Sequence, residues 1–301
     1  QHQLPTGFQS YVLNTRRTLL QDVRVREALG LAVDYEWMNR QMFYNSYTRV
    51  RGLFGNTSCA ASGMPSAEEL ALLEPWRGQV PDAVFGPAYA PPRTDGDSSL
   101  RINLRRAQKL LAEAGWQVEN ATLRNAQGQP FVLEYLDSNE TGARVVSPWM
   151  RNLEKLGVTL RFRPVDFALY QQRLQKFDFD ITTIAYAGTA NPGQEYADLF
   201  GSAAADTEDS GNLAGVRSPA VDAILDRMVG ARTRPDYLAA CHALERVITH
   251  SHYLIPQWYA GTHRMAYNAW RLERPKVTPP YFRGETWAID TWWARNPPGS
   301  R

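Results

Sequence analysis

Apolar residues near the start of the chain follow the spacing of one strand and two helices. A short apolar run ends at Leu13 and predicts a strand. Apolar residues then recur at the i, i+3, i+4, i+7 spacing of an amphipathic helix: Val25, Ala28, Leu29 and Ala32. Asp22 and Asp34 are typical N-cap residues, so each predicts the start of a helix.

From Asn103 onward the apolar pattern alternates between helical and extended spacing. An amphipathic helix is expected to end at Gly115, because glycine accepts the left-handed conformation there. The next five segments are predicted as strand, helix, strand, helix and strand: 131–136, 141–156, 158–163, 167–177 and 180–186. Strands and helices that alternate at these lengths indicate an α/β fold with some parallel pairing.

Residues 52–100 interrupt this alternation with recurrent Gly, Pro and Ser. We interpret them as an irregular, loop-rich excursion that covers a surface, with one short helix at 66–73.

Two more helices are predicted beyond residue 200. Ser218 and Pro219 are typical of an N-cap and a first helical residue, and Pro235 opens the second helix, which runs towards His250. An apolar stretch at 253–259 follows, and an aromatic, proline-rich segment ends the chain.

The net charge and the cysteines exclude only a few classes of protein. The 301 residues carry a formal net charge of +2 and contain no run of 18 apolar residues, so neither nucleic acid nor a membrane span is indicated. The chain begins at Gln1 without a signal segment, so we expect that a leader is removed or that a longer polypeptide exists. Cys241 falls on an apolar stripe, which favours a buried thiol, while a long-range disulfide with Cys59 stays open.

Five short segments then occur in one order along nearly the whole chain: DVRVREAL in 14–34, RRAQKLLAEAGW in 105–116, FDFD in 177–180, SPAVDAIL in 218–225 and IPQWY in 255–259. Together they resemble the family-5 extracellular solute-binding proteins, the oligopeptide, dipeptide and nickel binders of ABC importers. The segment 14–54 looks closest to the Yej-type branch, which is associated with uptake of peptides, including modified or murein-derived ones.

The resemblance implies a fold, partners and a location. Residues 1–264 look like the C-terminal lobe of a type II periplasmic-binding-protein fold, an α/β lobe with a mixed sheet flanked by helices. Residues 265–301 then form a tail that returns towards an N-terminal lobe absent from this chain. The implied partners are a peptide ligand and the permease subunits of an ABC importer in the inner membrane. The implied protein is periplasmic, has no cofactor and is not an enzyme.

The first candidate site is the loop after the last strand of the alternating region: Tyr186, Ala187, Gly188, Thr189 and Asn191. Ligands bind at the carboxyl end of strands in α/β sheets, and glycine lets a ligand approach the backbone. The matching family loop carries an aspartate that pairs with a peptide's free α-amine. That position falls at about Gly188 or Thr189, so the resemblance implies a blocked or modified peptide end, or an acid from the other lobe. An ordinary glycine turn is the alternative.

The second candidate group is Tyr11, Asn14, Arg16 and Arg17. Arginine offers a bidentate fork for a ligand carboxylate, but it is also common on solvated turns. Trp258 and Tyr259 are candidates for an aromatic cleft wall, with buried packing as the alternative.

Other chemistries find little support in the sequence. His250 and His252 do not share a helix face and lack an accompanying metal motif, so a metal site is not indicated. No Gly-x-Ser-x-Gly elbow and no phosphate-binding glycine loop occur. A nickel- or haem-type receptor of the same family and a secreted hydrolase remain as alternatives.

Overall fold

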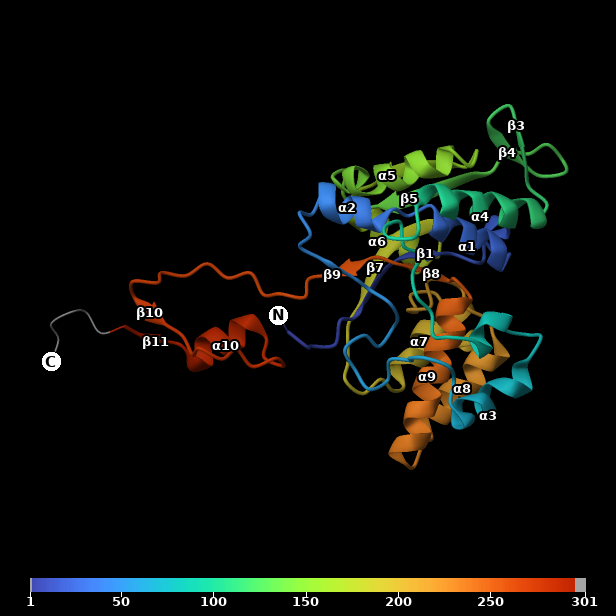
Figure 1. Cartoon of the computed structure of the whole chain (residues 1–301). Helices are drawn as coiled ribbons and strands as arrows, with labels where there is room; N and C mark the ends of the chain where they lie inside the picture. The colour runs from blue at the N-terminus through green and yellow to red at the C-terminus, as the bar shows by residue number, and fades with distance from the viewer. Residues whose placement is uncertain (1, 296–301) are drawn as a thin grey trace, which may run out of the picture.

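The computed structural model describes residues 2–295, except the side chain of residue 285. A five-stranded mixed sheet lies at its centre, in the order β6-β5-β7-β1-β8 (Figure 1). Its strands are β1 (Phe8–Leu13), β5 (Val132–Asp137), β6 (Thr159–Pro164), β7 (Ile181–Tyr186) and β8 (Leu254–Pro256). Strand β5 pairs in parallel with β6 and β7, whereas β1 is antiparallel to β7 and β8. The predicted α/β fold with a mixed sheet is confirmed.

Helices cover both faces of the sheet, and each layer has its own apolar core (Figure 1). One layer holds α1 (Val23–Leu31), α2 (Tyr35–Gln41), α4 (Leu100–Glu113) and α5 (Gly142–Glu154). The other holds α3 (Ala67–Leu73), α7 (Glu195–Phe200), α8 (Pro219–Val229) and α9 (Arg234–His250). Because side chains alternate along a strand, Tyr11 and Leu13 enter the first core while Phe8 and Val12 enter the second.

The remaining helical elements are α6 (Phe167–Gln175), α10 (Gly284–Thr291) and the 3-10 turns Thr18–Leu20, Glu74–Trp76, Asp82–Phe85 and Ser202–Asp206. Three small two-stranded sheets pair β2 (Thr48–Arg49) with β9 (Trp258–Tyr259), β3 (Gln117–Glu119) with β4 (Thr122–Arg124), and β10 (Leu272–Glu273) with β11 (Trp293–Ala294). In the part of the chain that the structure describes, no helix combines the length and the apolar character needed to traverse a bilayer.

The helix starts predicted from cap residues are confirmed. The side chains of Asp22, Asp34 and Ser218 each accept a hydrogen bond from a backbone N–H in the first turn of their helices. Helix α4 begins earlier than expected, because Ser99 caps it. The stop at Gly115 is confirmed too, with φ at +88°.

The excursion 52–100 does more than cover a surface, so that expectation was incomplete. Leu53, Phe54, Leu73 and Val84 are buried in the same core as α8 and α9. Apart from the short helix that ends at Leu73, these apolar residues fall in irregular segments without a period, so the pattern did not reveal them as core residues. Only the folded chain brings them together against α9.

A disulfide fastens this excursion to α9. Cys59 and Cys241 are bonded, with their Cα atoms 5.2 Å apart, and both are fully buried. The interpretation of Cys241 as a free buried thiol was therefore wrong. The stripe correctly placed Cys241 in the core, but its partner is 182 residues away in sequence.

A buried ion pair reinforces the same junction. Arg246 of α9 is fully buried, and its Nε donates to Glu69 Oε2 over 2.6 Å. Its other nitrogens donate to the backbone carbonyls of Ser62, Gly63 and Gly86. All three guanidinium nitrogens thus donate hydrogen bonds, and a buried charge is tolerated under that condition.

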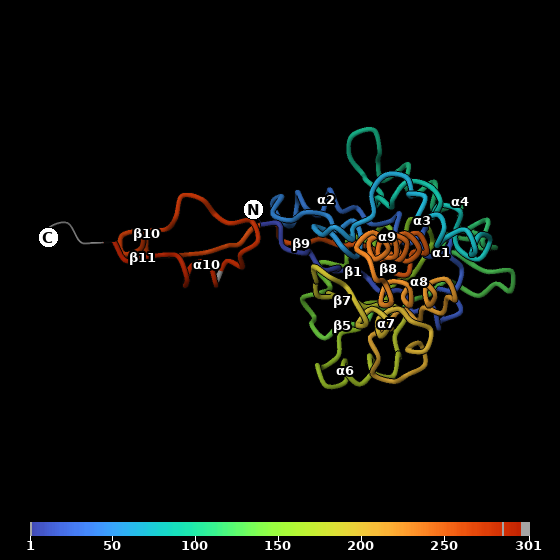
Figure 2. The backbone as a smooth tube through the Cα atoms, turned by 90° about the horizontal axis from the view of Figure 1, so that it is seen from below, coloured from blue at the N-terminus to red at the C-terminus, as the bar shows by residue number. Residues whose placement is uncertain are grey.

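Beyond about residue 262 the chain leaves the lobe. Figures 1 and 2 both show this segment extending away on the side where the N-terminus lies. Trp270, Val277 and Ile289 are largely exposed on it. The domain boundary near residue 264 stays a prediction.

Candidate ligand-binding site

The two groups of candidate residues lie at opposite ends of β1. Tyr186 pairs with Phe8 at one end of the strand, and Ile181 pairs with Leu13 at the other. Five residues of extended chain separate these ends by about 17 Å. The loop 186–193 therefore lies at the carboxyl edge of β7, and Asn14, Arg16 and Arg17 lie at the opposite edge of the sheet.

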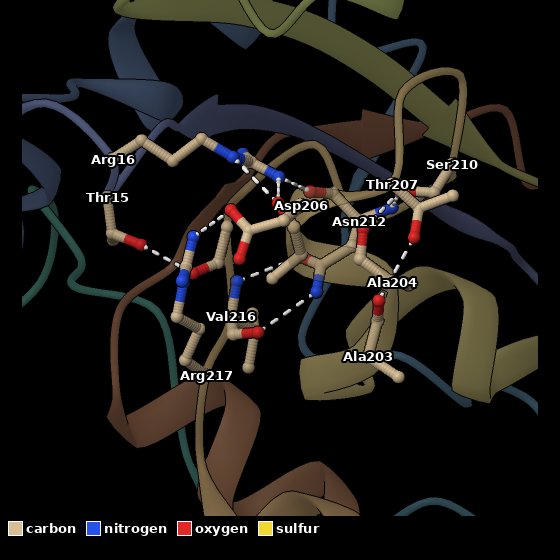
Figure 3. Close-up of polar contacts among 12 residues, drawn as sticks. Thr15, Arg16, Ala203, Ala204, Asp206, Thr207, Ser210, Asn212, Val216 and Arg217 are labelled. Atoms are coloured by element: carbon tan, nitrogen blue, oxygen red, sulfur yellow. Dashed lines mark hydrogen bonds and ion pairs between the residues drawn. The ribbon is translucent and has the colours of Figure 1, made fainter.

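Asn14 and Arg16 are held by contacts within the fold, and Figure 3 shows the polar contacts of Arg16. Asn14 is fully buried, and its amide donates to the carbonyl oxygens of Phe177 and Phe179. The Arg16 guanidinium donates to the carbonyls of Ala205 and Asn212, among others, and stacks 3.6 Å from the Phe177 ring centroid. Burial lowers the pKa of Arg16 to about 10. Asn14 thus fastens residues 177–179 to the end of β1, and Arg16 fastens the loop 201–217 there.

Arg17 and Tyr11 also contact neighbouring side chains within the fold. Arg17 forms ion pairs with Asp178 and Asp180 at 2.9 and 3.1 Å. Tyr11 is fully buried and stacks on Trp149, with ring centroids 4.5 Å apart. These contacts favour a structural role for Asn14, Arg16 and Arg17, whereas the Tyr11 hydroxyl is buried without a hydrogen-bond partner in the described chain. That these residues hold a ligand carboxylate stays a prediction.

The loop 186–193 presents its backbone instead. Ala187, Gly188 and Asn191 are exposed, and Thr189 is half-buried. Among residues 2–295, the peptide groups of 187–190 make no backbone–backbone hydrogen bond. A Cβ on Gly188 would lie 2.5 Å from the Gly7 nitrogen and 2.7 Å from the Pro5 oxygen, so only glycine fits there.

Tyr186 plays a different part from its neighbours. Its ring packs against Phe200, and its hydroxyl is buried with no hydrogen-bond partner in the described chain. Burial raises the pKa of this hydroxyl. Tyr186 is therefore half-buried and packs the start of the loop against the core.

Two residues of α9 hold the far end of the loop. Arg234 donates to Asn191 Oδ1 over 3.2 Å and to the Ser58 hydroxyl. The Tyr237 hydroxyl donates to the carbonyl of Pro192 over 2.7 Å. These bonds link the loop directly to the disulfide-bearing segment around Ser58.

A cavity of about 550 Å³ lies beside that segment. Its walls are the stretches 48–52, 60–63 and 88–90, together with Thr6 and Tyr259 and a polar strip of α9. The volume is in the range of small-ligand sites. Thr6 joins the cavity to the loop, because its neighbours Pro5 and Gly7 contact Gly188 while its own N–H donates to Gly55.

The two aromatic candidates, Trp258 and Tyr259, differ in their position relative to this cavity. Trp258 is buried among Tyr35, Phe43 and Tyr47, which favours the packing alternative, and its role as a cleft wall stays a prediction. Tyr259 is half-buried and lines the cavity, so its role as a cleft wall stays a prediction.

The charged groups of the cavity differ in their burial and in their hydrogen-bond partners. The carboxylate of Glu245 accepts from the backbone N–H groups of Phe54 and Ala61, and burial raises its pKa. Arg51 is exposed. Arg49 is the residue that sequence reasoning missed: its three guanidinium nitrogens are buried, with no hydrogen-bond partner within residues 2–295. An Arg-Val-Arg sequence offered no periodic signal that one arginine would be buried.

The histidines that were considered for metal binding are embedded in protein. His250 and His252 both meet the ring of Tyr89 edge-on, at centroid distances of 5.6 and 5.7 Å. Burial lowers the pKa of both, that of His252 to about 3. Across residues 2–295 no group of three or more metal-ligating side chains forms a candidate metal centre.

The comparisons with known proteins agree with this geometry. Residues 1–208 match the middle region of the bacterial extracellular solute-binding proteins, family 5. The chain belongs to this family, and its α/β lobe has the type II periplasmic-binding-protein fold.

Individual relatives are of the Yej type. The chain is 39% identical, over 95% of its length and 46% of the relative, to the probable peptide-binding protein YejA of Agrobacterium fabrum. It is 34% identical to the peptidoglycan-binding protein YepA of the same organism, over 97% of the chain and 47% of the relative. The chain thus spans about half the length of the curated relatives that it matches.

A solved structure supports the fold. The oligopeptide-binding protein AppA of Bacillus subtilis, in complex with a nonapeptide, matches with a TM-score of 0.66 and 16% identity. The match covers 97% of this chain and 51% of AppA. At this identity the likeness shows the shared architecture only.

Proposed function

We propose that this chain is the ligand-binding lobe of a periplasmic receptor that delivers peptides to the permease of an ABC importer. Relatives named as peptide-binding and peptidoglycan-binding proteins support this assignment, as does a family described as extracellular. The receptor binds and releases its cargo unchanged, so it is not an enzyme.

The observation that carries the proposal is the exposed backbone of the loop 186–193 beside the 550 Å³ cavity. Extended peptides are recognised by main-chain hydrogen bonds, with side-chain pockets adding selectivity. The free peptide groups of 187–190 supply the first element, and the cavity supplies the second.

The loop also bears on which peptides are bound. Neither Gly188 nor Thr189 can place a negative charge opposite a free α-amine. We therefore propose that the cargo includes peptides with a modified or blocked amino end, such as fragments derived from murein. The relative named as a peptidoglycan-binding protein is consistent with this choice.

The test is to identify the cargo. The intact protein is purified from its native periplasm and examined by native mass spectrometry, and any released ligand is sequenced. A co-purified peptide that rebinds in calorimetry and stays intact on incubation supports the proposal. A bound metal chelate, a cleaved peptide, or failure to bind any periplasmic peptide would contradict it.

A further inference from the structure

Arg49 is a buried charge without a hydrogen-bond partner in the described chain; the charge of Glu36 acts to raise its pKa from a distance, but the carboxylate of Glu36 accepts from Thr94. It lies in β2, opposite Trp258 of β9, and lines the 550 Å³ cavity. Its Nε, Nη1 and Nη2 atoms are all buried, and none has a hydrogen-bond partner in residues 2–295. A guanidinium carries five N–H donors, so the unmet bonding capacity is large.

Within residues 2–295, the favourable contact of the Arg49 guanidinium is with an aromatic ring and does not use those donors. The Arg49 guanidinium lies 4.9 Å from the centre of the Tyr35 ring, a cation–π distance. Such stacking stabilises the charge through the ring face and leaves the in-plane N–H groups free for a planar acceptor. Burial lowers the pKa of Arg49, which is the sign of a cation held away from water.

Two other buried arginines of this fold, Arg26 and Arg246, do have hydrogen-bond partners. Arg26 donates to the carbonyl oxygens of Leu20, Gln21 and Ser251. Arg246 is fully bonded as well, through Glu69 and three carbonyls. An unpaired buried charge is strongly unfavourable, and this chain avoids one at Arg26 and Arg246. The exception at Arg49 therefore calls for a partner outside the described chain.

The residues that line the cavity around Arg49 indicate the charge of its missing partner. Glu245 is the carboxylate among the cavity-lining residues, and two backbone N–H groups already occupy it. Arg51 adds a second positive charge at the exposed rim. The cavity therefore favours an anion, and a planar fork of N–H donors fits a carboxylate in bidentate fashion.

We infer that Arg49 binds the carboxylate of the ligand and thereby selects peptides with a free carboxyl group. This inference rests on the proposed function, because it assigns the cargo of that receptor a second required end group. The exposed loop then contacts the peptide backbone, and Arg49 holds the acidic group in the adjoining cavity.

The experiment compares Arg49→Met with Arg51→Met in the intact protein. Arg51→Met is the matched comparison, because it removes an exposed charge from the rim of the same cavity; it should lower the affinity for the acid by less than Arg49→Met does and keep the acid preferred. The probes are the peptide recovered from the periplasm, or tetra-alanine where none is recovered, each as the free acid and as the C-terminal amide. For the wild type and Arg51→Met we expect the acid to bind at least about tenfold tighter, a difference of about 1.4 kcal/mol. Arg49→Met should bind both forms equally.

A second readout separates ligand binding from a structural role. Replacing an unpaired buried charge by an apolar side chain relieves desolvation, so Arg49→Met should raise the melting temperature of the ligand-free protein. A lowered melting temperature, together with an unchanged preference for the acid, would overturn the inference. Equal binding of acid and amide by the wild type would also overturn it and would leave the proposed function standing.

If no peptide binds at all, the proposed function fails and sodium acetate becomes the probe. At equal ionic strength, acetate should then raise the melting temperature of the wild type and of Arg51→Met more than chloride does. The role of Arg49 as a carboxylate-binding residue survives if Arg49→Met abolishes that increment, and it fails if the increment is absent or unaffected.

Discussion

Removing the Cys59–Cys241 disulfide should weaken the fold substantially, because the bond closes a very long loop. The two residues are 182 positions apart. Chain-entropy arguments give a cross-link of this span a stabilisation of about 5 kcal/mol, and measured values typically lie at about 2–4 kcal/mol. Both cysteines are fully buried, so Cys→Ala also loses a little packing. We expect the Cys59→Ala/Cys241→Ala variant to lose about 3–5 kcal/mol.

The measurement is equilibrium denaturation of the intact protein in guanidinium chloride, followed by tryptophan fluorescence and circular dichroism. Wild-type protein unfolded and refolded under reducing conditions is the matched control, since it lacks the bond but keeps both side chains. The variant and the reduced protein should agree within about 1 kcal/mol. A loss below about 1 kcal/mol in both would refute the entropic reasoning, because the open chain would then be as constrained as the closed one.

Removing the disulfide should also increase local opening at the candidate site. The segment around Cys59 bonds to α9 through Ala61 and forms one wall of the cavity. Ser58 in turn accepts a hydrogen bond from Arg234, which holds the loop 186–193. Hydrogen exchange should therefore quicken first in residues 52–63 and in this loop, while the strands β5 and β6 stay protected. Uniform acceleration across the sheet would indicate global destabilisation only.

Three shorter predictions follow. Gly188→Val forces a Cβ into the backbone at Pro5, so ligand affinity should fall by at least about tenfold in calorimetry, and unchanged affinity would remove the loop from the site. Arg16→Met should cost about 2–3 kcal/mol of stability in urea denaturation while leaving the dissociation constant within about twofold, because its bonds are structural and lie at the far sheet edge. A hydrogen bond to Glu69 raises the pKa of His242 above its ordinary 6.5, so this pair stabilises the fold below pH 6.5 and loses its contribution as pH rises through the raised value. His242→Asn should therefore reduce the drop in unfolding free energy between about pH 6.5 and 8, and an identical pH profile would contradict the assignment.

Much of the fold was predictable because its signals are local. The cap residues Asp22 and Ser218 begin the helices they predicted, and the strand 159–164 shows the alternating burial expected of one covered face. The order of short motifs also identified the family, which the match over residues 1–208 confirms.

The candidate site was predictable only in part. The loop 186–193 follows a strand, so a general rule about the edges of α/β sheets located it correctly at a carboxyl edge. The arginine pair at 16–17 had no such rule, and residue type alone does not distinguish a ligand anchor from a residue bonded to carbonyls. Arg49 was missed because its significance is a burial without partners, which is a property of its three-dimensional surroundings.

By itself the sequence determined the elements, their caps, the α/β class and the family, since each depends on residues that are neighbours along the chain. Tertiary structure alone decided which distant groups meet. It paired Cys59 with Cys241, made core residues of Leu53 and Phe54, and put Arg16 and Gly188 at opposite edges of one sheet. The physical reason is that periodicity reports only whether a side chain is buried. What it is buried against depends on contacts between distant residues, 182 positions apart at the disulfide and 248 between Gln9 and Gln257.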